Sequence, residues 1–351
     1  MQAVLMREFG AVDVLRLEEV PTPVLGAGEA LVRVGAVEVS RTRDLGTRSG
    51  RHPFSALVTL PHVLGGDCAG VVELVAAGVD PDLVGRRVAV MNTHTCGRCA
   101  ACRAGRQHEC TKLEMVGIHR WGSYAQFVAV PVSSLHALPD DITLSEAAAL
   151  AAVGPIALHQ LRTAELGTGS TLLVTGGTGA LASVLVQLAS RFGTRVLALS
   201  RRPDLVVPVE GMTVLDARAE DLGERVRGLT DGRGADAVID NVCDPTVFDR
   251  YFPALANGSR IVVSGAIGTP ELPVLRVPAA PLYVRSIALI GVRTATSAVT
   301  SDFWELVRSG FRLPAGLLHE QPLHAAAAAH EAVMHGRAVG HTLLVVDGAL
   351  G

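Results

Sequence analysis

Four of the six cysteines lie within 15 residues, and their spacing is typical of a metal-binding loop. Two residues separate neighbours among the first three, and seven precede the fourth; the four are Cys96, Cys99, Cys102 and Cys110. Four thiolates on a short loop can close a tetrahedral zinc site with no open position, and such a site is structural. We therefore predict one structural zinc ion in a lobe over about 94–112. Cys68 and Cys243 lie in apolar surroundings and are predicted to be core residues.

A glycine-rich segment lies between a predicted strand and a predicted helix. It reads Val174-Thr-Gly-Gly-Thr-Gly-Ala-Leu-Ala182, with the pattern Gly177-x-Gly179-x-x-Ala182. Glycine lets the backbone approach a pyrophosphate closely, and the N-terminus of the next helix offers free N–H groups and a favourable dipole. This context predicts a dinucleotide-binding loop, and the alternative is a glycine turn that binds no ligand. The predicted cofactor contacts are Gly177, Thr178, Gly179, Ala180 and Leu181.

The end of the following strand indicates which cofactor binds. An NAD site usually has Asp or Glu about 20 residues after the glycines, where it accepts the ribose 2′-hydroxyl. Residues 195–203 contain no acidic side chain and include Ser200, Arg201 and Arg202. A guanidinium binds a phosphate through paired, charge-assisted hydrogen bonds. The sequence therefore predicts NADPH as the cofactor, and the alternative is that both arginines are solvated surface residues.

The elements that would position these motifs follow two different patterns. Over the first 150 residues, short apolar runs alternate with Gly, Pro and Asp, which predicts a β-rich domain. From about residue 170, strands that are apolar on both faces alternate with helices, which predicts an α/β, doubly wound parallel sheet. The predicted strands are 30–34, 70–75, 87–90, 124–130, 171–175, 195–199, 237–240, 260–263, 287–290 and 341–346, and the predicted helices are 180–192 and 325–335.

Composition excludes several classes of protein. The 351 residues carry 31 basic and 34 acidic side chains, a net charge of −3, which excludes nucleic-acid binding by bulk phosphate attraction. A hydrophobic content of 49% excludes disorder. No apolar run is predicted to reach the roughly 18 residues that span a bilayer, and the N-terminal residues are not expected to form a signal peptide. We expect a cytoplasmic protein with a small-molecule substrate and without nucleic-acid or membrane partners.

Together the motifs resemble the medium-chain dehydrogenase/reductase superfamily, which includes zinc alcohol dehydrogenases and quinone oxidoreductases. The matching segments are 28–34, 64–72, 96–110, 174–182, 234–240, 257–265 and 340–345. The resemblance implies a GroES-like, β-rich catalytic domain over 1–150 and 293–351, and a Rossmann NADP-binding domain over 151–292. It also implies a homodimer that forms through the strand at 285–290. The further candidate cofactor contacts are Arg41, Gly265 and Ala266, and Arg41 could instead reach a substrate anion.

The departures from the family pattern concern the catalytic zinc ion. Zinc alcohol dehydrogenases hold that ion with the cysteine of C-x-x-D, the histidine of G-H-E and a later third ligand. Here Ser40, Gly66 and Ala152 stand at those positions. One extra residue precedes Asp44, and Asp67 replaces the glutamate. We predict that no catalytic zinc binds, because serine, glycine and alanine cannot hold zinc against water. The alternative is a site rebuilt from nearby residues, namely His62, Asp67, Cys68 and His94.

The absence of these ligands bears on the reaction that we expect. Direct carbonyl reduction without a Lewis acid loses the stabilisation that a metal supplies, whereas a conjugated alkene can accept hydride at its β-carbon. The zinc-free branch of the superfamily is similar over residues 65–70. We therefore expect NADPH-dependent reduction of an activated C=C bond or a quinone. The candidate catalytic residues are Ser40, Thr42 and Tyr124, although Tyr124 could instead be a core aromatic residue with a satisfied hydroxyl.

Two other hypotheses remain at this point. The chain could be a zinc-free carbonyl or imine reductase, or a non-redox biosynthetic tailoring enzyme on the same scaffold. It could also be an NADPH-binding protein without turnover.

Overall fold

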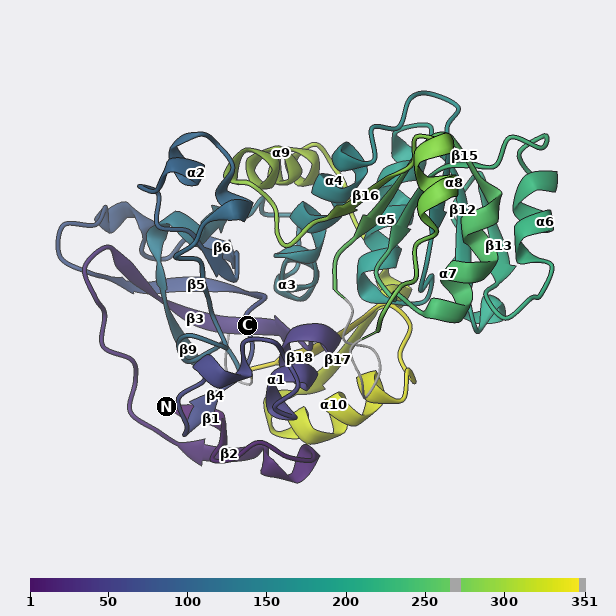
Figure 1. Ribbon diagram of the computed structural model, residues 1–351. Coiled ribbons are helices and arrows are strands. Elements are labelled where there is room, and N and C mark those ends of the chain that lie inside the picture. Colours follow the sequence, from purple (N-terminus) through teal and green to yellow (C-terminus); the bar gives the residue numbers. More distant parts are fainter. Residues whose placement is uncertain (266–272, 347–351) are drawn as a thin grey trace. The chain divides into compact units, whose positions relative to one another are not determined.

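The computed structural model describes residues 1–265 and 273–346. The chain divides into two compact units (Figure 1). The β-rich unit combines Met1–Val153 with Thr300–Gly351, and the α/β unit is Gly154–Val299. The predicted fold class is confirmed, because one unit consists mainly of antiparallel sheets and the other is built on a parallel sheet with helices between its strands.

The β-rich unit is organised around β3, the central strand of its largest sheet. The order in that sheet is β10-β6-β5-β3-β18-β17, with β9 also paired to β3; smaller sheets have the orders β2-β1-β4 and β7-β8. The strands are β1 (Gln2–Met6), β2 (Arg16–Glu19), β3 (Glu29–Glu38), β4 (His62–Val63), β5 (Cys68–Val75), β6 (Arg87–Val90), β7 (Thr93–His94), β8 (Glu114–Met115), β9 (Phe127–Pro131), β10 (Leu135–Ala137), β17 (Leu318–Pro322) and β18 (His341–Val345). Most of β3 is buried, since β5, β9 and β18 pair with it.

Short helices close this unit. Besides several 3-10 turns, its helical elements are a π-helical turn (Arg41–Leu45), α1 (Gly46–Arg48), α2 (Ala100–Arg103), α3 (Leu144–Leu150), α9 (Ser297–Arg308) and α10 (Ala326–Met334). Thr143 caps α3, because its hydroxyl oxygen accepts the N–H of Glu146 at 3.1 Å. Helix α10 consists largely of alanine and turns His330 into the core, where that side chain is fully buried. The helix predicted at 325–335 is therefore confirmed.

The α/β unit contains a six-stranded sheet in which every pair of neighbours is parallel. Its order is β13-β12-β11-β14-β15-β16, so the chain reverses its winding between β11 and β14. The strands are β11 (Thr171–Val174), β12 (Arg195–Ser200), β13 (Met212–Asp216), β14 (Ala235–Asp240), β15 (Leu255–Val263) and β16 (Ala288–Gly291). The helices are α4 (Val153–Thr163), α5 (Ala180–Arg191), α6 (Leu222–Gly228), α7 (Pro245–Tyr251) and α8 (Ala279–Val284).

Burial explains which strands the sequence revealed. All four residues of β11 are buried, as expected for a strand covered on both faces. Strand β13 was not predicted, because only Leu215 of its five residues is buried and its apolar signal is weak. The segment predicted as a strand from Tyr124 begins as a strand only at Phe127. Tyr124 instead packs in the core of the β-rich unit.

One helical segment of the described residues has the length and composition of a membrane span. It is Leu144–Thr163, in which α3 and α4 follow each other almost directly, and its mean hydropathy is 1.2. The segment is not one uninterrupted apolar run, because it contains Glu146, the Gly154-Pro155 pair and Arg162. In addition, 78% of its most apolar window is buried inside the structure, as in the core helix of a globular protein. Length and composition alone are thus weak support for a membrane span here.

Candidate active site and zinc lobe

The four cysteines of the predicted lobe lie together. Their sulfur atoms are all within 4.8 Å of one another, and the Sγ atoms of Cys96 and Cys110 are 3.6 Å apart. Backbone N–H groups of Arg98 and Cys99 point at Cys96 and lower the pKa of its thiol to about 6. Thiolates this close together require a cation, and four of them fit a tetrahedral zinc ion. The structure therefore supports the predicted structural zinc site.

The glycine-rich loop follows β11 and leads into α5. Gly176 adopts a φ of +68°, and a side chain there would meet Val242 at 2.9 Å. Gly177 donates its N–H to the carbonyl of Leu199 at 2.8 Å, which holds the loop against β12. Gly179 is the N-cap of α5 and offers no side-chain cap, so the first N–H groups of this 12-residue helix remain available to an anion. Thr178, Ala180 and Leu181 surround this helix start.

The residues predicted to select the cofactor lie at the same edge of the parallel sheet. Ser200 ends β12, is buried, and accepts the N–H of Arg202 at 2.9 Å. Arg201 is exposed and Arg202 is half-buried, and within residues 1–265 and 273–346 neither guanidinium has an ion-pair partner. Gly265, just beyond β15, has a φ of +93°. Ala266 lies outside the described residues.

A buried aspartate that the sequence analysis missed fixes the neighbouring strand end. Asp240 ends β14 and is 1% exposed. Its Oδ1 accepts the hydroxyl of Thr175 at 2.7 Å and the N–H of Cys243 at 2.9 Å, and its Oδ2 accepts the hydroxyl of Tyr251 at 2.7 Å. Because Thr175 directly precedes the glycines, Asp240 couples the glycine-rich loop to β14. Only its place at the end of an apolar run could have indicated this role.

In the β-rich unit, the segment after β3 forms a π-helical turn. The N–H groups of Asp44 and Leu45 both point at the carbonyl of Ser40, at 2.9 and 3.3 Å. Ser40 is half-buried, and its hydroxyl oxygen accepts the N–H of Arg43 at 3.3 Å. A π-helical turn accommodates one more residue than an α-helical turn. It therefore absorbs the extra residue that the sequence carries before Asp44.

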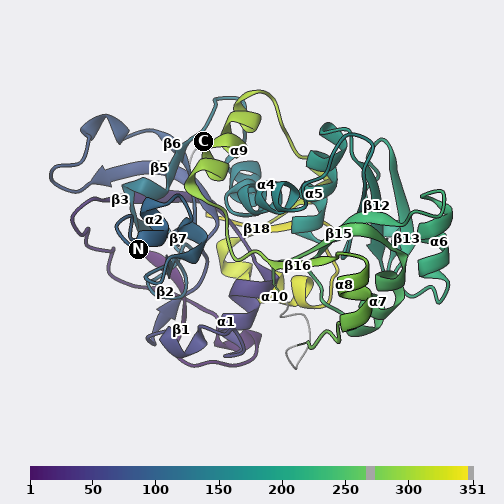
Figure 2. The same ribbon diagram turned by 45° about the horizontal axis from the view of Figure 1, so that its top comes forward.

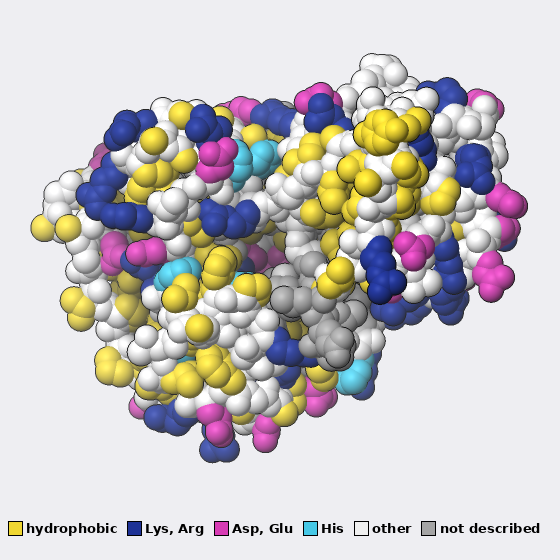
Figure 3. Space-filling view, viewed as in Figure 1, with side chains coloured by type: hydrophobic (Ala, Val, Ile, Leu, Met, Phe, Trp, Pro, Cys, Tyr) yellow, Lys and Arg dark blue, Asp and Glu magenta, His cyan; other side chains and the backbone are white. Residues whose placement is uncertain are grey.

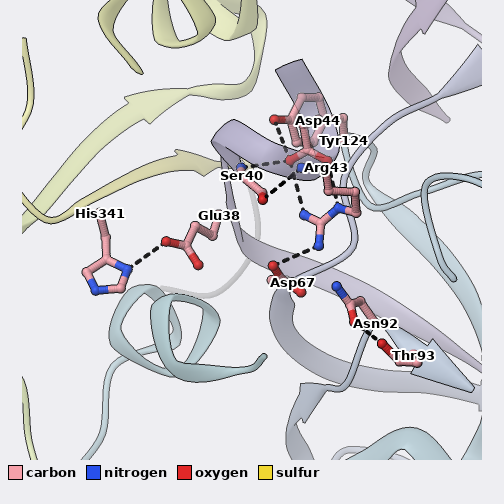
Figure 4. Close-up of polar contacts among 9 residues, drawn as sticks. All are labelled: Glu38, Ser40, Arg43, Asp44, Asp67, Asn92, Thr93, Tyr124 and His341. Carbon is pink, nitrogen blue, oxygen red and sulfur yellow. Dashed lines mark hydrogen bonds and ion pairs between the residues drawn. The ribbon is translucent and has the colours of Figure 1, made fainter. Parts of the chain in front are cut away.

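The side chain of Arg43 lies between two carboxylates (Figure 4). Its Nε bonds Asp44 at 2.8 Å, and its Nη1 bonds Asp67 at 2.7 Å. All three side chains are at most 5% exposed. Burial raises the pKa of Asp67 to about 6, against the lowering effect of the nearby Arg43 charge. The sequence analysis did not identify this triad, because Arg43 and Asp67 are 24 residues apart.

Tyr124 is fully buried beside this triad. Its hydroxyl donates to Asp44 at 3.2 Å and lies 3.0 Å from Nε2 of His330. Burial and the Asp44 charge raise the pKa of Tyr124 well above its usual value. This is the arrangement of the alternative interpretation, a core aromatic residue with a satisfied hydroxyl. A catalytic role for Tyr124 stays a prediction.

A second buried pair closes the same region. Nδ1 of His341, at the start of β18, lies 2.6 Å from Oε1 of Glu38, at the end of β3. Oε2 of Glu38 and Oδ1 of Asp67 are buried and have no hydrogen-bond partner in the described part of the chain. Arg41 points elsewhere, because its guanidinium donates to the main-chain oxygens of Val333 and Met334, the latter at 3.1 Å. Its cofactor contact stays a prediction.

The residues at the family's catalytic-zinc positions do not fit a zinc ion. Ser40 accepts a hydrogen bond from the backbone, Gly66 has no donor atom, and Ala152 is aliphatic and buried. Over residues 1–265 and 273–346, the cysteine lobe is the only cluster of three or more candidate metal ligands. The alternative that drew on His62, Asp67, Cys68 and His94 is thus not supported by the geometry. Asp67 is engaged by Arg43 instead.

The fold and the site together define an oxidoreductase with a dinucleotide-binding loop and a structural zinc lobe. Residues 26–140 match the family model "Alcohol dehydrogenase GroES-like domain", and residues 180–309 match "Zinc-binding dehydrogenase". The chain belongs to the medium-chain dehydrogenase/reductase superfamily. It is accordingly an enzyme of the dehydrogenase class that uses a nicotinamide cofactor and a small-molecule substrate.

Relatives match most of the chain. An NAD-dependent alcohol dehydrogenase of Sulfolobus acidocaldarius is 31% identical and covers 76% of this chain and 78% of its own length. An L-threonine 3-dehydrogenase of Symbiobacterium thermophilum is 29% identical over 97% of both chains. A crystal structure of an NAD-dependent alcohol dehydrogenase superposes with a TM-score of 0.88 at 30% identity, covering 99% of this chain and all of its own.

These relatives correct the functional hypothesis. Reduction of an activated C=C bond or a quinone was predicted, whereas the relatives are named as dehydrogenases of alcohols and of threonine. That prediction was wrong. The error arose because the missing zinc ligands were taken to select a different reaction. They show only that the residues at positions 40, 66 and 152 do not form a zinc site.

The lobe predicts a metal content of one zinc ion per chain. The four thiolates of the lobe can bind one zinc ion, and the residues at the catalytic-zinc positions can bind none. Elemental analysis of the purified protein should give one zinc, and Cys99→Ser should reduce it to none and unfold the lobe. Cys243→Ala, a buried cysteine outside the lobe, is the matched control and should retain one zinc. Two tightly held zinc ions per wild-type chain would contradict the interpretation.

Acid should destabilise the β-rich unit through buried neutral histidines. Burial lowers the pKa of His330 from 6.5 to about 4. Between these pH values the unfolded chain binds more protons than the folded chain. The contribution of His330 to the free energy of unfolding is therefore fully present above pH 6.5. It is lost as the pH drops towards 4, by roughly 3 kcal/mol for such a shift. Urea midpoints measured from pH 7 to 4 should fall less steeply for His330→Gln than for wild type. The exposed His324→Gln should keep the wild-type slope; an unchanged slope for His330→Gln would refute this assignment.

Proposed function

We propose that this enzyme interconverts a small alcohol and the corresponding carbonyl compound with a nicotinamide cofactor. The observation that carries the proposal is the alcohol dehydrogenase that is 31% identical over 76% of the chain. The glycine-rich loop, shaped by Gly176, Gly177 and Gly179, supports it by offering a pyrophosphate site.

The π-helical turn supplies the groups that would handle the substrate oxygen. Thr42 is half-buried, and its hydroxyl has no partner among the described residues. Ser40 is adjacent and retains its own hydroxyl proton, because its oxygen acts as an acceptor towards Arg43. When bound, the cofactor accepts hydride from the alcohol carbon or returns it to the carbonyl carbon. The hydroxyl of Thr42 would donate a hydrogen bond to the substrate oxygen and stabilise its negative charge, with Ser40 passing the proton onward.

Isotope transfer tests the reaction class. The enzyme would be incubated with 4-deuterated reduced cofactor and a panel of aldehydes, ketones and enones, and the label located by NMR. Label on the carbonyl carbon supports the proposal, and label on the β-carbon of an enone contradicts it. Thr42→Ala should lower kcat by about 10²-fold, with a smaller effect on KM, because the charge develops only in the transition state. The exposed Thr22→Ala serves as the matched control and should leave both constants unchanged.

We further propose that the preferred cofactor is NADPH. The end of β12 carries Ser200, Arg201 and Arg202 and no carboxylate that could accept a ribose 2′-hydroxyl. The carboxylate of Asp216, on the adjacent β13, is held by Arg218 at 3.0 Å. Two guanidinium groups without ion-pair partners at this strand end suit a 2′-phosphate. In this respect the chain would differ from relatives whose names specify NAD.

Removing both guanidinium groups should reduce the discrimination between cofactors. Charge-assisted hydrogen bonds contribute about 1.5–3 kcal/mol, so Arg201→Ala/Arg202→Ala should weaken NADPH binding by roughly 10- to 150-fold and leave NADH binding nearly unchanged. Titration of cofactor fluorescence measures both affinities. Arg195→Ala, an exposed arginine at the opposite end of the same strand, should change neither. Tighter binding of NADH than of NADPH to the wild-type enzyme would overturn the proposal.

We also propose a homodimer that forms through β16, the edge strand of the α/β unit (Figure 2). Apolar side chains gather on the surface over α8 and β16 (Figure 3): Tyr283 is 76% exposed, Val284 67% and Leu289 43%. An apolar edge strand needs a partner or a cover. Light scattering should report a dimer for wild type and a monomer for Leu289→Arg, and a monomeric wild type at micromolar concentration would exclude this interface.

We also propose that the protein is cytoplasmic. The lobe requires four reduced thiolates, and such thiols persist in reducing compartments. Fractionation of cells that express a tagged chain would test it, and recovery with membranes would contradict it.

A further inference from the structure

We propose that the guanidinium of Arg43 takes over the place and the positive charge of a catalytic zinc ion, and that Gly66 is the residue that makes room for it. The inference goes beyond the proposed function, because it concerns the construction of the site and requires no particular substrate. It is carried by three observations on the β-rich unit: an inserted residue, a steric exclusion and a charge balance.

The inserted residue lies beside a zinc-ligand position. The family resemblance puts metal ligands at positions 40 and 66, and Arg43 belongs to the π-helical turn that begins directly after Ser40. The turn contains one residue more than the C-x-x-D spacing. The inserted residue lies within a closed turn, because the carboxylate of Asp44 accepts the N–H of Ser40 at 2.9 Å.

The steric exclusion links Arg43 to Gly66. A Cβ atom added at Gly66 would lie 2.9 Å from Cζ and from Nη1 of Arg43, and equally close to Cβ of Asn92. Carbon atoms do not approach this closely without displacement of one of them. A histidine at position 66 and the observed guanidinium therefore compete for the same volume. The loss of the histidine and the gain of the arginine are two parts of one change.

The charge balance indicates what the guanidinium does. Nε and Nη2 of Arg43 bond the two oxygens of Asp44 at 2.8 and 3.1 Å, and Nη1 bonds Asp67 at 2.7 Å. Buried carboxylates are costly unless a cation and hydrogen bonds compensate them. A guanidinium keeps its proton in proteins, and it is attached to the chain by covalent bonds. The compensating charge is thus permanent, whereas a metal ion can dissociate.

Arg43 acts in this arrangement as a positioning residue. The carboxylate that it fixes, Asp44, also accepts the hydroxyl of Tyr124 at 3.2 Å. The π-helical turn, which carries Thr42, is consequently held between the guanidinium and the core. Loss of the guanidinium would release the turn and leave the carboxylates of Asp44 and Asp67 without their cation.

A stability cycle tests the steric part. Gly66→Ala should lower the Tm of the wild-type protein by roughly 3–10 °C, as expected for overpacking. In the background Arg43→Ala/Asp67→Asn, which removes the guanidinium and one of its carboxylates together, the same substitution should lower the Tm by less. The loss that remains comes from Cβ of Asn92, which still lies 2.9 Å from the added atom. Gly35→Ala is the matched control, since a Cβ there would meet Leu144 at 2.4 Å and not Arg43, and it should cost the same in both backgrounds. Equal losses for Gly66→Ala in the two backgrounds would overturn the proposal.

Metal content tests the replacement itself. A variant with restored ligands, Ser40→Cys/Gly66→His/Ala152→Cys, would be made with Arg43 retained and with Arg43 deleted. The deletion restores the C-x-x-D spacing, and that variant should hold two zinc ions per chain, whereas the variant that retains Arg43 should hold one. The cobalt-substituted deletion variant should show additional tetrahedral d–d absorption. Equal zinc contents in the two variants, whether one or two, would overturn the proposal.

These readouts require neither substrate nor turnover. A failure of the alcohol dehydrogenase assignment would appear in the isotope experiment and leave the metal counts and Tm differences as they are.

Discussion

Buried carboxylates hold the functional loops of both units in place. Asp44 is fully buried and accepts hydrogen bonds from the main chain of Ser40, the guanidinium of Arg43 and the hydroxyl of Tyr124. Asp240 does the same in the α/β unit and ties the glycine-rich loop to the neighbouring strand. An unsatisfied buried carboxylate is expensive, so each loop is restricted to the conformation that satisfies its carboxylate. The backbone of the site is thereby set before any ligand binds.

The features that the sequence revealed are those with local signals. The cysteine lobe and the glycine-rich loop each lie within about 15 consecutive residues, and the spacing of their cysteines and glycines is specific to such sites. Continuous apolar runs predict the parallel sheet, because its strands are buried on both faces. The inserted residue before Asp44 was also visible, although the π-helical turn that absorbs it was not, because spacing alone does not say whether an extra residue enters a turn or a loop.

The features that sequence reasoning missed depend on contacts between distant residues. His330 meets Tyr124 across 206 positions, and His341 meets Glu38 across 303. No periodicity in one sequence connects such partners. The functional hypothesis failed for a related reason: absent ligands at positions 40, 66 and 152 describe a chemistry that the chain lacks, and they contain no information on which bond it reduces. Relatives that match most of the chain bear on that question, because they are named as dehydrogenases of alcohols and of threonine.

The close approach between Gly66 and the guanidinium also restricts how such a site can change over time. A chain that carries Arg43 cannot acquire a histidine at position 66 without a clash, since even a Cβ atom would come within 2.9 Å of the guanidinium. A chain that loses Arg43 first leaves Asp44 and Asp67 buried without their cation. Each single step back towards a metal centre therefore passes through a less stable protein. Single mutations would therefore tend to keep Arg43 in the site. A change to a zinc-binding site would require at least two coordinated substitutions.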